Sequence, residues 1–475
     1  MARRSSSRQS EKARPAAHWA ADIGISFRKL EIRCSLGPIS EFPKGLLLTQ
    51  SHYDWRNGPA EIDPHSVTKH DVLVGYLIRY FEQRTLNARG RERLRITLVD
   101  GFCGGGLYTL EGLGAEILGS PLRMLDAVRE ASFRVNSERT KPIDLDVCYI
   151  FIDKDARALS HLKKVLHDRG YGAQIGQSIH VIHDEFVSAS GAVFKLIENH
   201  TPRSHTALFF LDQYGYSDVP APLIQKIFSQ SPKSEVILTF HVSAFATYTN
   251  DEFTEKISRK LAIDIRSALG GRTIEKIKEE NSADWRRFIQ AALYHALVKD
   301  CGAEYFTPFF IRGEGSGQGE YWLVHLSRHP RAQDVMKQVH WAHQNDSIHY
   351  GGAGLDMLAT HMMGFRQKFK GGFVFDDVAQ NLSAGVLPQH LAENIFRRGQ
   401  PVQIGELYSS TCNTSPGTSL MYKDALERLC REQDIVIRSE DGTARRFARY
   451  MRDTDWIERN RQKSLFNLLP VGIGK

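Results

Sequence analysis

Five short apolar runs, separated by amphipathic stretches, constrain the fold of this chain more than any other feature of its sequence. The runs lie at 94–99, 146–152, 179–183, 207–211 and 235–240, and the stretches with helical periodicity lie at 120–131, 155–169, 190–200 and 221–230. Continuous apolar strands that alternate with helices are typical of a parallel sheet covered on both faces. The sequence therefore predicts an α/β domain.

Two further strands are expected at 306–311 and 321–327, on either side of the glycine-rich stretch GEGSGQG at 313–319. A strand follows these glycines where a phosphate-binding loop would need a helix, so they favour an antiparallel hairpin. Five parallel strands closed by such a hairpin are the strand inventory of a class I methyltransferase (Rossmann-like) sheet.

The C-terminal region has a different pattern. Helices are expected at 387–398, 404–411 and 417–432, followed by a hairpin over 434–451 that turns at Glu440-Asp441-Gly442. Three helices and a β-wing are the element order of a winged helix, in which the third helix would read nucleic acid. Binding of a protein partner is the competing role for such a domain.

With 475 residues the chain is long enough for about two or three domains. We expect a disordered basic tail at 1–25, an accessory segment at 26–66, a methyltransferase-like domain at 67–345 with a helical insertion at 251–302, a connector at 346–385, and a winged-helix-like domain at 386–475.

Composition excludes several classes of protein. No apolar run approaches the roughly 18 residues of a membrane span, and the six cysteines contain no C-x-x-C pair. We therefore expect a cytoplasmic protein with no membrane association and no structural metal. The net charge is +7 and the pI is near 9.0, with basic residues near both ends. This charge fits either solvated surfaces or contact with a polyanion such as nucleic acid.

Glycine residues follow the first predicted strand, in LVDGFCGGGLY at 98–108. Ligands of open parallel sheets bind beyond the carboxyl ends of the strands, where side chains in this loop would occupy the ligand's volume. Gly104, Gly105 and Gly106 therefore predict a cofactor loop. A tight turn that binds no ligand remains the alternative.

Acidic residues stand at the ends of four predicted strands: Asp100, Asp153, Asp184 and Asp212. Asp153 is suited to ribose hydroxyls, and Asp184 with its neighbours to an adenine amine. Polar residues at one or two strand ends are common caps, whereas four at one sheet edge favour a ligand site.

Several stretches together resemble the three-Cys-motif partner (TcmP) family, whose members look like class I S-adenosylmethionine-dependent methyltransferases. The matching stretches are VTKHDVLVGYL (67–77), LVDGFCGGGLY (98–108), GSPLRML (119–125), IFIDKD (150–155), LFFLDQYGYSDVP (209–221) and YFTPFFI with YWLVHLS (305–327). The resemblance covers about residues 51–345. It implies S-adenosylmethionine as the cofactor, and a role in a multi-protein system of the bacterial phage-defence type.

The resemblance also assigns residues by position. Those expected to bind the cofactor are Asp100, Gly101, Phe102, Gly104, Gly106, Asp153, Asp184 and Glu185. Asp212, Gln213 and Tyr214 would face the substrate, with Asp212 accepting the proton or amine hydrogens of the nucleophile and Tyr214 stacking against it. Lys69 and His70 would lie at the mouth of the site; otherwise they are a solvated helix turn.

This chain departs from the family pattern at one site, and two hypotheses about its function therefore remain. Where the family usually has Asp-Pro-aromatic-Gly, this chain has Asp212-Gln213-Tyr214-Gly215. The first hypothesis is a methyltransferase that acts on nucleic acid and methylates an amine or a base. The second is a catalytically altered subunit that binds the cofactor and acts as a partner or sensor.

Overall fold

The computed structural model describes residues 53–460 apart from 57, 63, 87, 89, 111–113, 214–217, 242–249, 281–284, 312–320, 344–346, 350–351, 356 and 358–372. Its largest sheet is built from the seven predicted strands. These are β2 (Arg93–Asp100), β5 (Asp144–Asp153), β6 (Ile179–His183), β7 (Ala207–Leu211), β8 (Glu235–His241), β9 (Tyr305–Ile311) and β10 (Tyr321–Ser327).

The order of these strands across the sheet is β6-β5-β2-β7-β8-β10-β9. The first five are parallel, and β10 is antiparallel to both β8 and β9. The predicted fold class is therefore confirmed: a methyltransferase-like α/β sheet with an antiparallel closing hairpin. The glycines expected at the hairpin turn lie outside the described residues.

Two short strands extend this sheet beyond the hairpin. β11 (Ser347–His349) pairs with β9, and β12 (Phe373–Val374) pairs with β11. Both segments lie in the region expected to be a connector, 346–385. Strands of two or three residues show no periodicity that a sequence could reveal, and they depend on pairing with an existing sheet edge.

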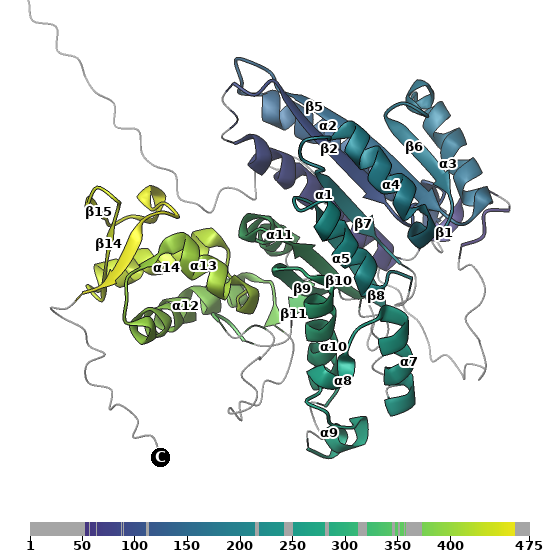
Figure 1. Cartoon of the computed structure of the whole chain (residues 1–475). Helices are drawn as coiled ribbons and strands as arrows, with labels where there is room; N and C mark the ends of the chain where they lie inside the picture. The colour runs from purple at the N-terminus through teal and green to yellow at the C-terminus, as the bar shows by residue number, and fades with distance from the viewer. Residues whose placement is uncertain are drawn as a thin grey trace, which may run out of the picture. The chain divides into compact units, whose positions relative to one another are not determined.

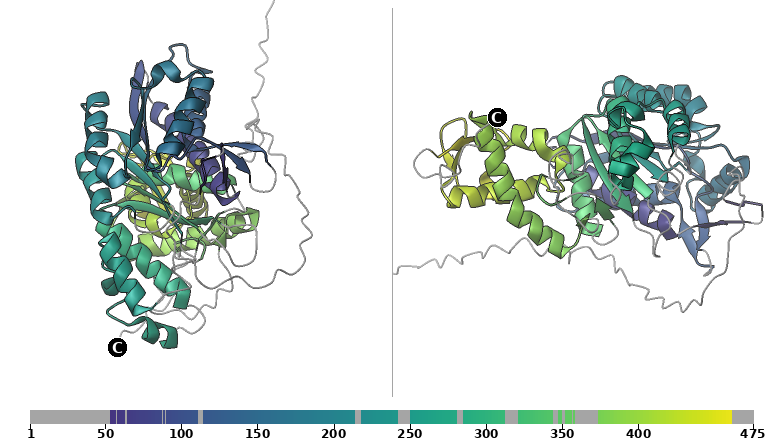
Figure 2. Two further views of the ribbon diagram at one scale, coloured as in Figure 1. Left: turned by 90° about the vertical axis from the view of Figure 1, so that its right-hand side faces the viewer. Right: turned by 90° about the horizontal axis from the view of Figure 1, so that it is seen from below.

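Helices cover both faces of the sheet (Figures 1 and 2). One face packs against α1 (Pro64–Thr85), α2 (Ser120–Asn136), α3 (Ala156–Asp168) and α11 (Pro330–His343). The other face packs against α4 (Phe186–His200), α5 (Ala221–Gln230) and α10 (Trp285–Cys301). Strands buried on both faces explain why their sequences are continuously apolar.

The region expected to be a helical insertion contains α7 (Asp251–Leu261), α8 (Ile265–Ala268), α9 (Ile274–Glu280) and α10. Apolar side chains of these helices, among them Ile257, Ile265 and Ile274, belong to the same core cluster as α5. The insertion is thus fixed to the sheet domain by apolar packing.

A small second sheet lies beside the first and was not predicted. Its order is β1-β3-β4, formed by β1 (Ala60–Ile62), β3 (Leu107–Leu110) and β4 (Glu116–Leu118). A separate apolar cluster, which includes Trp55 and Tyr108, packs against it. Parallel pairing of β1 with β3 joins segments that are far apart in the sequence, so no local pattern indicates it.

The C-terminal part has the predicted winged-helix elements. Its helices are α12 (Asp377–Arg398), α13 (Ile404–Thr411) and α14 (Ser419–Arg431), and its sheet has the order β13-β16-β14-β15. The strands are β13 (Val402–Gln403), β14 (Ile435–Arg438), β15 (Ala444–Arg445) and β16 (Trp456–Arg459). β14 and β15 form the predicted hairpin, and β13 and β16 were missed.

The helix α12 begins ahead of the predicted start at 387. Asp376 caps it by accepting a hydrogen bond from the Ala379 N–H at 2.8 Å, and Pro388 lies in its interior. Proline is more favourable in the first turn of a helix than in its interior, so the residues before Pro388 carry little sign in the sequence that they belong to the same helix.

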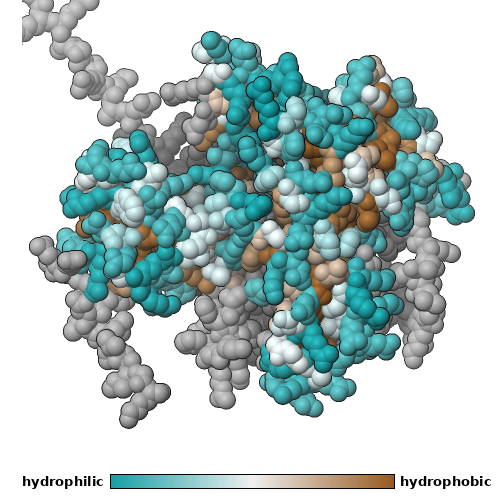
Figure 3. Space-filling model, in the orientation of Figure 1, coloured by the Kyte–Doolittle hydropathy of each residue, from teal (hydrophilic) through white to brown (hydrophobic). Residues whose placement is uncertain are grey.

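The face of the molecule in Figure 3 is mostly hydrophilic, with apolar side chains exposed in separate small areas. Among the described residues, no helix combines the length and the apolar composition that a membrane crossing requires.

Candidate active site

The strand register brings the four predicted acids to one edge of the sheet. Asp100 is paired with Phe151 on one side and with Phe210 on the other. Asp153 and Asp212 stand two positions beyond these partners, and Asp184 directly follows β6, whose last residue pairs with Asp153. The carboxyl ends of parallel strands meet at one edge, so this clustering follows from the topology.

Asp100 is completely buried at the end of β2. Its Oδ1 accepts a hydrogen bond from the Phe102 N–H at 3.2 Å, whereas its Oδ2 accepts no hydrogen bond of ordinary geometry from the described residues. Burial raises the pKa of Asp100 to about 7, and the nearby charges of Asp212 and Asp153 act in the same direction. Hydrogen bonding by the Ser120 side chain and by the Phe102 N–H opposes this shift. A buried carboxyl oxygen that accepts no hydrogen bond destabilises the folded state. Such an oxygen is expected where a bound ligand donates the hydrogen bond instead.

The glycine loop has the backbone conformation that only glycine adopts easily. Gly104 and Gly106 have φ values of +59° and +78°. The spaces that side chains would occupy there are filled by the protein itself: a Cβ on Gly105 would lie 2.2 Å from the Trp55 ring, and one on Gly104 would lie 2.0 Å from the Tyr108 hydroxyl. These glycines are therefore required by packing, whether or not a cofactor binds.

Gly101 and Phe102, at the start of the loop, are also fixed by local packing. The Gly101 N–H donates to the Phe210 carbonyl at 3.0 Å, and a Cβ on Gly101 would lie 2.7 Å from Leu211. Phe102 is half-buried and lies 6.3 Å, between ring centroids, from Phe186 of α4.

The two acids expected to bind adenosine differ in their surroundings. Asp153 is half-buried and accepts backbone hydrogen bonds from Gly104 at 2.9 Å and Asp155 at 2.8 Å. Burial raises its pKa against these hydrogen bonds, which lower it. Asp184 and Glu185 are exposed, and the Asp184 Oδ1 accepts the Glu185 N–H at 2.8 Å. Asp153 thus accepts two backbone hydrogen bonds and Asp184 accepts one.

Asp212, at the end of β7, forms a buried ion pair with Lys69 of α1, with 2.6 Å between Nζ and Oδ1. The Thr239 hydroxyl donates to the same oxygen at 2.5 Å. Burial alone would raise the pKa of Asp212, but the charge and hydrogen bond of Lys69 and the hydrogen bond of Thr239 outweigh it and lower the pKa. Asp212 is therefore a carboxylate at neutral pH.

His70 is buried beside this ion pair, and its ring lies edge-on to Phe210 at 6.4 Å between centroids. Burial lowers the pKa of His70 to about 3, although the charge of Asp212 opposes this shift. The imidazole is thus neutral, and its Nδ1 has no hydrogen-bond partner among the described residues.

Gln213 is buried and closes the turn after Asp212. Its Oε1 accepts hydrogen bonds from the Asp218 and Val219 N–H groups at 3.0 and 3.2 Å. Its amide nitrogen, Nε2, has no partner among the described residues. Tyr214, the predicted stacking ring, lies outside the described residues.

Five predicted site residues therefore lie close together at the carboxyl edge of the sheet: Lys69, His70, Asp100, Asp212 and Gln213. Three of these residues have a buried polar side-chain atom that forms no hydrogen bond of ordinary geometry with the described part of the chain. One acceptor (Asp100 Oδ2), one donor (Gln213 Nε2) and one imidazole nitrogen (His70 Nδ1) can bind a polar ligand that contains both amino and carbonyl or carboxylate groups.

Two residues that matter for this region were missed in the sequence. Thr239 is a polar residue within an otherwise apolar run, VILTF, near the carboxyl end of a strand, and a sequence analysis could have used that position. Trp55 covers Gly105 from a segment outside the predicted domain, and nothing in the sequence links the two positions.

Comparison with known proteins identifies the C-terminal region. Residues 364–442 match the family model of a GMT-like wHTH domain, that is, a winged helix-turn-helix. The match includes α12, α13, α14 and β14 and confirms the winged helix. A search of curated proteins found no match to the chain.

Solved structures show only distant likeness. A protein of Legionella pneumophila, LPL1258, has 12% identity and a TM-score of 0.31 over 57% of this chain and 89% of its own. A Methanococcus maripaludis protein described as an S-adenosyl-L-methionine-dependent methyltransferase has 12% identity and a TM-score of 0.25, over 60% and 97%. Loganic acid methyltransferase has 9% identity and a TM-score of 0.23, over 56% and 97%. The strand order and register of the sheet define the fold.

Proposed function

We propose that this protein is an S-adenosylmethionine-dependent methyltransferase that acts on nucleic acid. The observation that carries the proposal is Asp100: a fully buried carboxyl at the end of the first strand of a methyltransferase-like sheet. One of its oxygens accepts no hydrogen bond of ordinary geometry from the described residues, although the Ser120 side chain lies close enough to lower its pKa. An ammonium group of a ligand would supply the missing hydrogen bond and the missing charge.

S-adenosylmethionine fits the residues at this rim. Asp100 would accept hydrogen bonds from the amino end of the cofactor, and Asp153, held by two backbone N–H groups, would face its ribose with its remaining lone pairs. Asp184 with Glu185 would bind the adenine, and Gly101, Phe102, Gly104 and Gly106 would form the floor. When bound, the cofactor supplies an electrophilic methyl group on a positively charged sulfur.

We assign Asp212 to substrate binding: it would orient the nucleophile and would not accept its proton. Its pKa is lowered, so it is a weak base, and its Oδ1 is already occupied by Lys69 and Thr239. Its other oxygen accepts no hydrogen bond from the described residues, and that oxygen would orient an amine or hydroxyl nucleophile. Methyl transfer needs alignment more than it needs acid–base catalysis. Gln213 would donate its amide N–H to the same substrate, and Tyr214 would stack on it.

Nucleic acid is proposed as the substrate for two reasons. The winged helix is a fold that binds nucleic acid in many proteins, and the chain carries a net charge of +7. The resemblance to the TcmP family supports a role in a multi-protein bacterial defence system.

The test combines calorimetric titration with S-adenosylmethionine and a tritiated-methyl transfer assay on DNA, RNA and tRNA. We expect wild-type binding and transfer. Asp100→Asn should abolish binding, and Asp212→Asn should retain binding within about threefold while transfer falls at least roughly 100-fold. Asp168→Asn, an exposed acid on α3, is the matched control. Loss of binding in both site variants would contradict this division of roles.

A second function is favoured by the turn after Asp212, which lacks the proline usual in the family. We infer that a subunit which binds the cofactor without transferring its methyl group is the alternative. Binding of S-adenosylmethionine with no transfer to any nucleic acid would favour it.

A further inference from the structure

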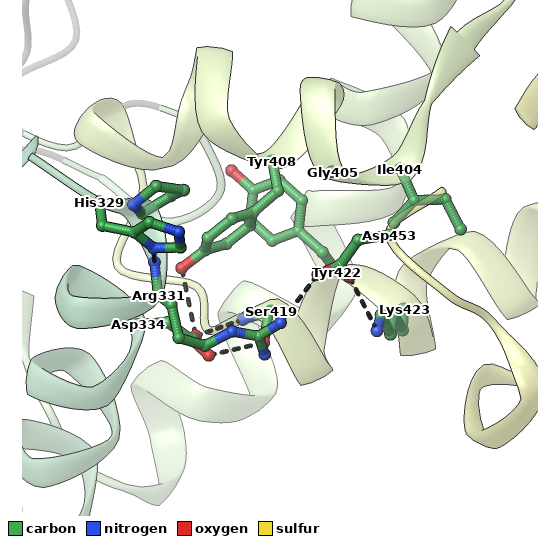
Figure 4. Close-up of a pocket in the computed structure, with 11 residues that line it drawn as sticks. His329, Arg331, Asp334, Ile404, Gly405, Tyr408, Ser419, Tyr422, Lys423 and Asp453 are labelled. Carbon is green, nitrogen blue, oxygen red and sulfur yellow. Dashed lines mark hydrogen bonds and ion pairs between the residues drawn. The ribbon is translucent and has the colours of Figure 1, made fainter. Parts of the chain in front are cut away.

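The winged helix contacts the sheet domain through the helix that would be expected to read DNA (Figure 4). Asp334 of α11 accepts hydrogen bonds from the N–H and the hydroxyl of Ser419, both at 2.6 Å, and from the Tyr408 hydroxyl at 3.1 Å. Ser419 is the first residue of α14. Recognition helices present their N-terminal residues to base edges, so in this arrangement α14 cannot use them for that purpose.

Buried polar contacts reinforce this junction. Lys337 of α11 is completely buried and donates hydrogen bonds to the carbonyls of Cys412 at 2.8 Å and Gly417 at 3.3 Å. The Gln333 side chain donates to the Phe306 carbonyl at 2.6 Å and to the Asn413 side chain at 2.9 Å. The segment that precedes α14 is therefore held by α11.

The cations of α14 are neutralised within the protein. Lys423 pairs with Asp453 at 3.1 Å, Arg428 with Glu432 at 2.9 Å, and Arg431 with Glu427 at 3.1 Å. Such pairs leave little net charge on the helix for a polyanion.

The segment after the wing differs in charge. Residues 444–452, ARRFARYMR, contain four arginines and no acid. Arg445 lies 3.7 Å from the buried Asp455. Arg446, Arg449 and Arg452 are exposed and form no ion pair with any carboxylate among the described residues.

Two large aromatic rings are exposed between these arginines. Phe447 and Tyr450 are 52% and 54% exposed, and their ring centroids are 6.4 Å apart. The Arg449 guanidinium lies over both rings, at 5.6 and 4.8 Å from their centroids. Exposed aromatic rings that adjoin one another indicate a binding surface.

This segment is held in place by its neighbours. The 3-10 turn Ala448–Tyr450 is anchored by a hydrogen bond from the Ala448 N–H to Glu427 at 2.7 Å, and Ala448 and Met451 are buried. The Arg452 N–H donates to Asp455 at 2.7 Å. Because the backbone is fixed, the exposure of the two rings is a property of the folded domain.

We propose that Arg446, Phe447, Arg449, Tyr450 and Arg452 form a binding surface for single-stranded nucleic acid. Unpaired bases stack on exposed aromatic rings and arginine guanidiniums, while the remaining arginines bind the phosphates. The bases of a duplex are stacked on one another and cannot use such rings. The inference deepens the proposed nucleic-acid substrate, but it does not depend on methyl transfer.

The test measures fluorescence anisotropy of labelled single-stranded DNA, single-stranded RNA and duplex DNA with the full chain, without S-adenosylmethionine. We expect tighter binding of a single strand than of the duplex. Phe447→Ala and Tyr450→Ala should each weaken single-strand binding by roughly tenfold. Arg446→Ala with Arg452→Ala should make the slope of log K against log salt shallower by about 0.7 for each phosphate that the variant no longer neutralises.

Two control variants make the result specific. Phe133→Ala removes a ring that is 72% exposed on α2, and Arg428→Ala removes a paired cation on α14; both should bind as the wild type does. Preference for duplex DNA with weaker binding in Arg428→Ala would overturn the proposal in favour of α14. Absence of binding to every oligonucleotide would overturn it in favour of a protein partner. If the protein binds a single strand but transfers no methyl group to it, the proposed binding surface is supported and the proposed methyltransferase activity is contradicted.

Discussion

Lys69 and Asp212 are 143 positions apart in the sequence, yet the Lys69 Nζ lies 2.6 Å from the Asp212 Oδ1. This contact joins α1 to the carboxyl end of β7. It lowers the pKa of the residue assigned to the substrate, and it places the first helix of the domain at the rim of the site.

Substitution of Lys69 should show how much the Lys69–Asp212 ion pair contributes to the free energy of unfolding. In Lys69→Met the buried carboxylate loses its partner, and the free energy of unfolding should fall by about 3–5 kcal/mol at pH 7. The pKa of Asp212 is lowered by Lys69 in the native protein; without Lys69, burial would raise it instead. The deficit should therefore shrink between pH 7 and pH 5, where the carboxyl becomes protonated.

Urea denaturation at both pH values measures this effect. Arg129→Met is the matched control, since it breaks an exposed ion pair with Asp126 and should cost less than about 1 kcal/mol. A deficit in Lys69→Met as small as that of the control would mean that the pair is not energetically coupled.

Asp100 should make the protein less stable as the pH rises. Its folded pKa of about 7 lies above the unfolded value of about 3.9, so the folded state keeps a proton that the unfolded state has lost. The resulting cost grows from pH 4 to pH 7 and is fully present above pH 7. Asp100→Asn should gain about 2–3 kcal/mol relative to the wild type between pH 5 and pH 8, as measured by urea denaturation.

Asp168→Asn, an exposed acid, serves as the control for this series and should show no such gain. An Asp100→Asn curve parallel to that of the wild type would contradict a raised pKa.

The affinity for S-adenosylmethionine should rise with pH if Asp100 binds its ammonium group. Only the ionised carboxylate pairs with a cation, and a pKa of about 7 leaves a few per cent ionised at pH 5.5 and most of it at pH 7.5. The dissociation constant from calorimetry should fall by roughly 20-fold over this interval. A pH-independent affinity would show that Asp100 does not face the cationic end of the cofactor.

Gly105 should be coupled to Trp55. A Cβ at position 105 would lie 2.2 Å from the Trp55 ring, so Gly105→Ala should destabilise the protein by about 1–3 kcal/mol. In a Trp55→Ala background most of that cost should disappear, and thermal unfolding of the double-mutant cycle measures the coupling. Gly191→Ala, in α4 with open space around it, should instead stabilise by up to about 1 kcal/mol.

Because of Lys337, the free energy of unfolding should increase between pH 8 and pH 10. Burial lowers the pKa of Lys337 to about 8, below the unfolded value of about 10.4. The charged form is disfavoured in the folded state, so stability rises as the pH increases from 8 to 10. Relative to Lys337→Met, the wild type should gain about 2 kcal/mol over that interval in urea denaturation, whereas Lys164→Met, an exposed lysine on α3, should not alter the pH dependence.

The sequence by itself determined the fold of the main sheet and of the winged helix. The pattern of apolar residues in strands such as 94–99 and in helices such as 155–169 shows which of their residues are buried. Once the ends of the strands are predicted, the acids that follow them are expected at one edge of the sheet. The short strands β1, β11, β12 and β16 carry no such signal, because their stability comes from pairing with distant segments.

Tertiary structure alone decided how the residues of the site interact. The sequence placed Asp212 at the rim, but its ionisation depends on Lys69 and Thr239, and the need for Gly105 depends on Trp55. The availability of α14 depends on Asp334 of another helix. Desolvation and charge act through space over a few ångströms, and the folded chain brings residues to such distances without regard to their separation in sequence.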